Sequence, residues 1–335
     1  MESGPGPTDV GLTMPARPRR IGATVYVDQS HLSEAFKARS GLRTSAGFRE
    51  LAECVEHVAH RANLVFSLVH VLELSRWDDD RMRQGMCDWL DGLELVWARS
   101  KDAVEHDEEE RCLKLCAGLA TPPVNAFAPS LLSSLDDITV SDVPSALRGA
   151  SVRSFVEVAR TAPQTPWQEA LVTNLVHMRN DGQLADDLRL SDKARADILR
   201  ENRRRDLVER AHAAHQRLSA DPAYVALKPD PEEISATFAR RVAGDDTLLR
   251  SNTIVGDHVR ALLAVGVARS AGSRGERRLL SAPLDAMHAA VGGAYCDIFT
   301  CDHETDRWLG SARERLGLER QLTDVDAIVG RLRLL

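Results

Sequence analysis

Five acidic residues of this chain stand where their side chains could share a metal ion: Asp28, Glu73, Asp285, Asp302 and Asp306. The first four each lie in or next to a short apolar or small-residue stretch, which predicts positions at the edge of a core, and Asp306 lies about one turn after Asp302. Clustered carboxylates repel one another unless a cation neutralises them. Mg²⁺ and Mn²⁺ prefer such oxygen ligands, and two such ions about 4 Å apart can support phosphodiester hydrolysis. The five acids therefore suggest a site for Mg²⁺ or Mn²⁺.

Each acid also has a simpler explanation. Asp28 and Ser30 are typical of the start of a helix, where short polar side chains accept backbone hydrogen bonds. Asp285 follows Pro283 at a helix start, where an acid complements the helix dipole. Glu73 could be a solvated side chain, and Asp306 could pair with Arg307 or another arginine. It is the ordered set of acids that favours a site.

The order of elements predicts where the acids meet. Strands are expected at 23–27, 63–74 and 93–98, with helices between them, and such alternation indicates a parallel sheet. Asp28 follows the first strand and Glu73 lies at the end of the second. The last strand, 295–301, ends at Asp302 and contains Asp297. In open α/β sheets, ligands bind at the carboxyl ends of the strands.

The chain divides into four parts by pattern. Residues 1–20 are rich in Pro and Gly and are predicted to be a disordered tail. Residues 21–100 and 250–335 carry the α/β pattern, and the second also ends in helices. Residues 101–249 read as a helical insertion, in which Asp230 and Pro231 mark a helix start.

Four motifs resemble those of PIN-domain (PilT N-terminus) metal-dependent nucleases. They are "TVYVDQSHL", "SLVHVLEL", "PLDAMHAA" and "DIFTCD", and they contain Asp28, Glu73, Asp285 and Asp302 in that order. The resemblance covers about residues 21–100 and 250–315. It implies a three-layer α/β/α fold with a central parallel sheet, and it implies that these four acids are catalytic and bind metal. Thr300, Ser30 and Asp306 are supporting positions, with Asp306 a further metal ligand. The long insertion departs from compact PIN domains.

The resemblance implies a nuclease, and an endoribonuclease in particular, that uses Mg²⁺ or Mn²⁺ to activate water. RNA is favoured over DNA as the partner. The alternative is a PIN-like module that binds RNA or a protein without cleaving, although such a module has no need of four acids. A haloacid-dehalogenase-like phosphatase is disfavoured, because that chemistry needs a second Asp where this chain has Ser30.

Several other residues are weaker candidates. His288 lies one turn after Asp285 and could touch the substrate or a metal-bound water, or could simply pack. Two basic clusters could contact phosphates, although runs of Arg are usually solvated. The clusters are Arg274, Arg277 and Arg278, and Arg203, Arg204 and Arg205.

Composition narrows the class of protein. The chain has 335 residues, 43% of them hydrophobic and 4% aromatic, which favours a helix-rich α or α/β protein. A net charge of -7 excludes a generally basic nucleic-acid coat. No apolar run has membrane-spanning length, and a cytoplasmic protein is expected, with a protein partner at the insertion or a homo-oligomer left open. The six cysteines are expected to be reduced thiols. The alternative, a zinc site of Cys296, Cys301 and His303, has poor spacing.

Overall fold

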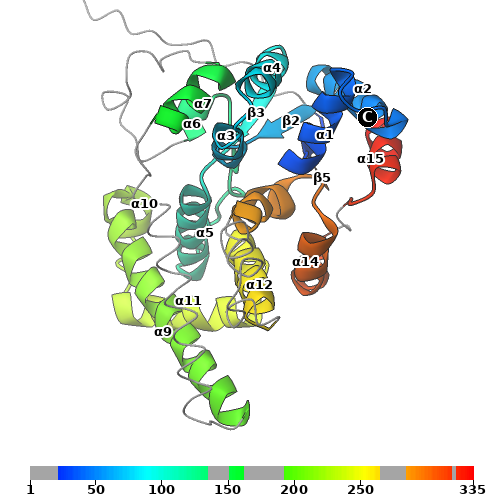
Figure 1. Cartoon of the computed structure of the whole chain (residues 1–335). Coiled ribbons are helices and arrows are strands. Elements are labelled where there is room, and N and C mark those ends of the chain that lie inside the picture. Colours follow the sequence, from blue (N-terminus) through cyan, green and yellow to red (C-terminus); the bar gives the residue numbers. More distant parts are fainter. Residues whose placement is uncertain (1–21, 135–150, 162–191, 265–283, 319–321) are drawn as a thin grey trace, which may run out of the picture.

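The computed structural model describes residues 22–134, 151–161, 192–264, 284–318 and 322–335. Its core is a five-stranded sheet in the order β4-β3-β2-β1-β5 (Figure 1). Four neighbouring strands are parallel, and β4 pairs with β3 in the antiparallel direction. The strands are β1 Thr24–Tyr26, β2 Asn63–Phe66, β3 Leu95–Ala98, β4 Phe127–Ala128 and β5 Ile298–Phe299.

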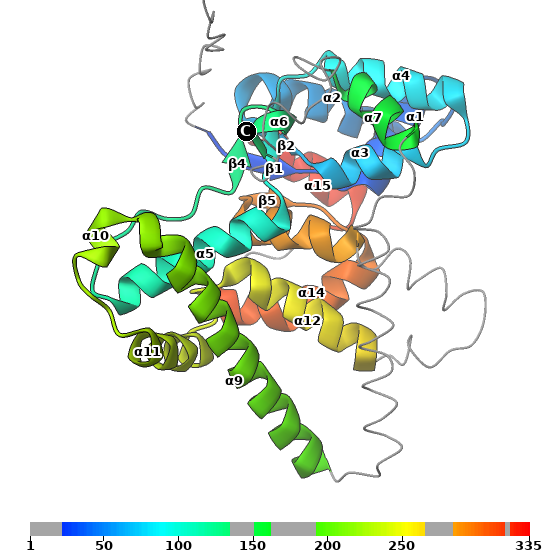
Figure 2. The same cartoon turned by 90° about the vertical axis from the view of Figure 1, so that its left-hand side faces the viewer.

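Side chains alternate between the two faces of the sheet, as the pleat of a strand requires. Val25 and Leu64 point into one apolar cluster, whereas Tyr26, Val65 and Phe299 belong to another on the opposite face. Helices cover both faces, so the structure is a layered α/β fold. In Figure 2, α1, α2, α4 and α7 lie above the sheet and α5, α12 and α14 lie below it.

Two groups of helices form the outer layers. The helices of the first face are α1 Gln29–Arg39, α2 Ala46–Arg61, α3 Leu68–Ser75, α4 Asp80–Asp91, α7 Val152–Thr161 and α15 Val325–Leu332. Those of the second face are α5 Lys101–Cys116, α12 Arg250–Ala264, the π-helix Ala289–Gly293 and α14 His303–Leu316. The short helix α6, Leu131–Ser134, follows β4.

A third apolar cluster joins α5, the first helix of the predicted insertion, to further helices of that insertion. These are α9 Asp192–Arg217, α10 Pro222–Val225 and α11 Pro231–Gly244. Glu109 of α5 accepts from Arg210 at 2.6 Å and from Arg217 at 2.7 Å, so ion pairs reinforce the apolar contact. The amino-terminal part of α9 extends away from the other helices (Figures 1 and 2).

Part of residues 101–249 nevertheless belongs to the α/β layers. The strand β4 lies within this range and forms one edge of the sheet, so the sheet is mostly rather than wholly parallel. The helix α7 places Val152, Phe155 and Val156 in the core of the first face. The range therefore contributes both to the sheet domain and to the separate helical cluster.

Local signals predicted several elements well. Asp230 caps α11, its carboxylate accepting from the Glu233 backbone N–H at 2.9 Å, and Pro231 is the first helical residue.

The last strand is shorter than predicted, because β5 has only two residues and Asp297 precedes it. The Asp297 carboxylate accepts from the backbone N–H and the hydroxyl of Thr24, at 2.7 and 2.9 Å. That pairing explains how an acid is accommodated beside a buried strand.

Two features concern the class of protein. None of the helices in the described parts of the chain has the length and apolarity needed to cross a membrane. All six cysteines are free thiols, as the sequence predicts. The predicted tail, residues 1–20, lies outside the described residues.

Candidate functional site

Asp28 and Asp302 follow neighbouring parallel strands and lie at the same edge of the sheet, the one formed by the carboxyl ends of these strands. Strand β1 pairs with β5, with Tyr26 opposite Phe299, and each acid comes two or three residues after its strand. Both acids are also helix N-caps. Asp28 accepts from the Ser30 N–H at 3.1 Å, and Asp302 accepts from the Thr305 N–H at 2.6 Å. The prediction that these two acids share an edge is confirmed. The capping role given as the alternative for Asp28 is also observed, and Asp302 caps α14 in the same way.

Thr300 ties the two strand ends together. Its buried hydroxyl accepts from the Asp28 backbone N–H at 2.9 Å and lies 3.2 Å from His31 Nδ1. The Ser30 side chain is exposed and donates to Asp28, so of the two residues expected at this helix start, Asp28 and not Ser30 is the N-cap of α1. Sequence reasoning missed His31, whose signal was its place one helical turn after Asp28.

Glu73 is not at the end of a strand, so that prediction is wrong. Strand β2 ends at Phe66, and Glu73 lies in helix α3. The N-cap of this helix is Ser67, whose backbone N–H donates to His70 Nδ1 at 3.1 Å. Most of α3 is buried, so its sequence is apolar on nearly every side. Periodicity alone cannot separate such a helix from a buried strand.

Asp285 lies on the helical turn 284–288 and is partly buried. Its pKa depends on the charges of the other acids. This pKa is raised from 3.8 to about 8, chiefly by burial. The charges of Asp302, Asp28 and Glu73 contribute to the rise, whereas the charge of His288 opposes it. The four predicted acids therefore share one electrostatic environment.

His288 is buried directly behind the acids. Its Nε2 lies 3.1 Å from Glu73 Oε2, and its Nδ1 is hydrogen-bonded to the Tyr26 hydroxyl. Burial lowers the pKa of His288, but the charge and hydrogen bond of Glu73, with the charges of Asp28 and Asp285, raise it above its ordinary value. The ring thus partly balances the negative charge of the site.

Asp306 has a different partner. Its Oδ1 accepts from Arg313 Nη1 at 2.7 Å, and the two residues lie on the same face of α14. The arginine pairing given as its alternative is therefore observed, with Arg313 rather than Arg307. A role for Asp306 as a metal ligand stays a prediction.

The acids are suitable ligands for a metal ion by their chemistry, but their side chains do not converge on a common point. Carboxylate oxygens are the ligands that Mg²⁺ and Mn²⁺ prefer. Within the described residues, however, no three His, Cys, Asp or Glu side chains converge closely enough to hold an ion, and this includes Cys296, Cys301 and His303. One oxygen of each of Asp28 and Asp302 accepts from a backbone N–H at a helix N-cap, Oδ2 in Asp28 and Oδ1 in Asp302.

The predicted basic contacts are largely outside the structure. Arg205 is exposed on α9. The side chains of Arg203 and Arg204, and the whole of Arg274, Arg277 and Arg278, lie outside the described residues. Their contact with nucleic acid stays a prediction.

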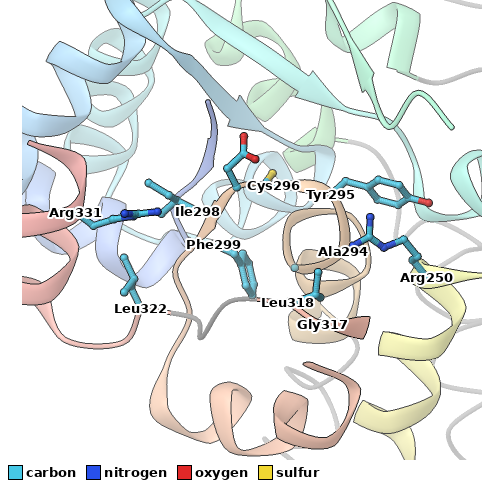
Figure 3. Close-up of a pocket in the computed structure, with 12 residues that line it drawn as sticks. Arg250, Ala294, Tyr295, Cys296, Ile298, Phe299, Gly317, Leu318, Leu322 and Arg331 are labelled. Carbon is cyan, nitrogen blue, oxygen red and sulfur yellow. The ribbon is translucent and has the colours of Figure 1, made fainter. Parts of the chain in front are cut away.

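A pocket of about 340 Å³ lies at the other end of β5, before the strand begins. Its lining includes Tyr295 and Asp297, and Arg250 and Arg331 lie on opposite sides of it (Figure 3). The Arg250 guanidinium is 5.7 Å from the centre of the Tyr295 ring. None of the five predicted acids lines this pocket, so it is separate from the acids.

Comparisons of the chain with protein-family models, curated proteins and solved structures found no match. The PIN-like assignment therefore stays a prediction based on the four motifs. Independently of any family, the chain forms an α/β fold in which Asp28 and Asp302 share one sheet edge. The charges of both acids raise the pKa of Asp285.

Proposed function

We propose that this protein is a PIN-like, metal-dependent nuclease that hydrolyses phosphodiester bonds in RNA in preference to DNA. The observation that carries the proposal is that Asp28 and Asp302 follow neighbouring parallel strands, and that their charges and that of Glu73 add to the effect of burial in raising the pKa of Asp285 to about 8. Four carboxylates that influence one another in this way form a strong field for a hard cation.

The residues would divide the work by their place in the fold. Asp28 and Asp302 would hold Mg²⁺ or Mn²⁺ from the sheet edge, and Glu73 and Asp285 from the neighbouring helices. When bound, the cation supplies charge neutralisation and Lewis-acid activation of water at the phosphodiester. Thr300 holds the backbone of Asp28 beside β5 and so fixes the distance between the two strand ends.

The test is cleavage of single-stranded RNA and DNA oligonucleotides in Mn²⁺, Mg²⁺ or EDTA, with Asp28→Asn and Asp302→Asn beside the wild type. Asn caps a helix about as well as Asp, so both variants should fold while losing one negative charge. We expect cutting that needs the cation and falls by at least about 100-fold in each variant, because losing a metal ligand should cost no less than losing an outer residue that orients one.

Asp324→Asn is the matched control. Asp324 caps α15 in the same manner, accepting from the Asp326 N–H at 3.0 Å, but it is not one of the four acids. It should cut like the wild type. Equal cutting by the Asp28, Asp302 and Asp324 variants, or the absence of any cation-dependent cutting, would contradict the proposed function.

One observation favours the second candidate, a PIN-like module that binds RNA or a protein without cleaving. In the described part of the chain, no three ligand-type side chains converge on a common point. Such a module would bind RNA equally well in EDTA and in Mg²⁺, with Asp28→Asn binding like the wild type. A filter-binding assay under both conditions separates the two candidates.

A further inference from the structure

Four buried polar side chains form a connected cluster behind the acids. The Tyr26 hydroxyl lies 2.8 Å from Ser67 Oγ and is also bonded to His288 Nδ1. Ser67 Oγ lies 2.9 Å from His70 Nδ1. The four residues come from β1, the start of α3 and the turn 284–288, so the cluster joins three elements that are distant in the sequence.

His70 anchors one end of the cluster. Its Nδ1 must accept, because the Ser67 backbone N–H donates to it, and its Nε2–H donates to the Val27 carbonyl at 3.0 Å. Both ring nitrogens are therefore occupied, and the ring orientation is fixed. Burial, together with the charge of His288, lowers the pKa of His70 well below its ordinary value, so this ring is neutral.

The other end of the cluster is Glu73. A carboxylate can only accept, so His288 Nε2–H is the donor in the 3.1 Å contact with Glu73 Oε2. His70 and Glu73 are three residues apart on α3 and share a face of that helix. Tyr26, Ser67 and His70 thus support the His288 ring on one side. On the other side, this ring contacts the Glu73 carboxylate.

Close packing holds the cluster in place. The helix that carries His288 continues as the π-helix Ala289–Gly293. A Cβ atom on Gly292 would stand 2.8 Å from Tyr26 Cγ, so only glycine allows the Tyr26 ring to lie where it does. Short π-helices are rare and are often found at functional sites.

We propose that His288 is a positioning residue for Glu73: it holds this carboxylate at the acid site through Nε2, while Tyr26 fixes the ring through Nδ1. This inference rests on the proposed function. His288 is 2% exposed and both its nitrogens bond to protein groups, so it has no free atom to offer to a substrate. The geometry therefore favours a supporting role over direct contact with substrate.

Two substitutions at His288 separate its two contacts. In His288→Gln, the side-chain amide reaches about as far as Nε2 and can still donate to Glu73. In His288→Asn, the shorter amide lies near the position of Nδ1 and can meet only Tyr26. If His288 acts through Glu73, the Gln variant should keep the function of the site and the Asn variant should lose it.

The measurement is Mn²⁺ binding to the full chain, followed by the electron paramagnetic resonance signal of free Mn²⁺. We expect His288→Asn to weaken Mn²⁺ binding by about tenfold to 100-fold, the range found when a residue that orients a metal ligand is removed. His288→Gln should stay within about threefold of the wild type. Melting temperatures show whether each variant is folded.

A double-mutant comparison makes the test independent of packing effects. Glu73→Gln removes the charge that His288 is proposed to hold, so adding His288→Asn to it should weaken Mn²⁺ binding no further. Tyr26→Phe keeps the ring but removes its hydroxyl, and should weaken binding less than His288→Asn does. Should His288→Asn fail to fold, the Gln and Phe variants still test the two contacts separately.

The outcomes distinguish this inference from the proposed function. Equal weakening in the Gln and Asn variants, or a further tenfold loss in the double variant, would overturn the positioning role alone. A wild-type protein that binds no Mn²⁺ at millimolar concentration would overturn the metal site, and the positioning role with it.

Discussion

A carboxyl group that holds its proton up to about pH 8 should make the free energy of unfolding depend on pH. Asp285 is such a group, since burial and the neighbouring acids raise its pKa from 3.8 to about 8. Because the pKa is higher in the folded state, the protonated carboxyl group stabilises the fold. That contribution is complete below about pH 3.8 and is lost as the pH rises through about 8.

The size of the effect follows from the shift. Each pH unit between the two pKa values changes the free energy of unfolding by about 1.4 kcal/mol. Two of the units between pH 6 and pH 9 lie below the pKa of about 8, so the wild type should lose at most about 3 kcal/mol over that interval. For a chain of this size, that loss lowers the melting temperature by about 5 °C.

The assay is a melting curve in EDTA at pH 6, 7, 8 and 9 for the wild type and Asp285→Asn. Asn has nearly the same shape but does not ionise, so its melting temperature should fall about 5 °C less over this interval. Asp230→Asn, on α11, should follow the wild type. Parallel curves for the wild type and Asp285→Asn would refute the reasoning, because they would mean that Asp285 does not hold its proton.

A cation adds a second arm to the same experiment. At pH 9, where Asp285 is ionised, millimolar Mg²⁺ should raise the melting temperature of the wild type and leave Asp285→Asn almost unchanged, since a ligand that binds only the folded state stabilises it. A pH effect without the Mg²⁺ effect would leave Asp285 as a buried acid that binds no metal.

Two further predictions concern packing and thiol chemistry. Gly292→Ala brings a methyl group to 2.8 Å from an atom of Tyr26 and should cost about 1–3 kcal/mol in the free energy of unfolding by urea, whereas Gly330→Ala, in open space on α15, should not destabilise the protein. Cys116 has its pKa lowered to about 7, chiefly by the hydrogen bond from Cys112, whereas burial raises that of Cys87 to about 11. In stopped-flow labelling at pH 7, Cys116 should therefore react well before Cys87, and equal rates would contradict this difference.

Local signals explain which parts of the fold could be predicted. An Asp that follows an apolar run and precedes a helix predicts both a strand end and an N-cap, and Asp28 is both. The pair Asp230–Pro231 predicts a helix start because both preferences act within one turn. The alternation of such elements was enough to predict that Asp28 and Asp302 share one edge.

Glu73 shows where local signals fail. The run 63–74 is mostly apolar, which suits a buried strand and a buried helix equally well. The change to a helix depends on the Ser67 N–H bonding to His70, and on the burial of α3 among other elements. The polar residues Ser67 and His70, three positions apart inside the run, were the local hint of that change.

What the sequence determined by itself is the order of strands and acids, the helix starts and the apolar alternation of the sheet, because each depends on residues within a few positions of one another. Only the tertiary structure decided that His288 meets Glu73 and Tyr26, that Asp306 pairs with Arg313, and that β4 completes the sheet. Tyr26 and His288 are 262 residues apart. No spacing rule links such residues, because their contact exists only once three packed elements have brought them together.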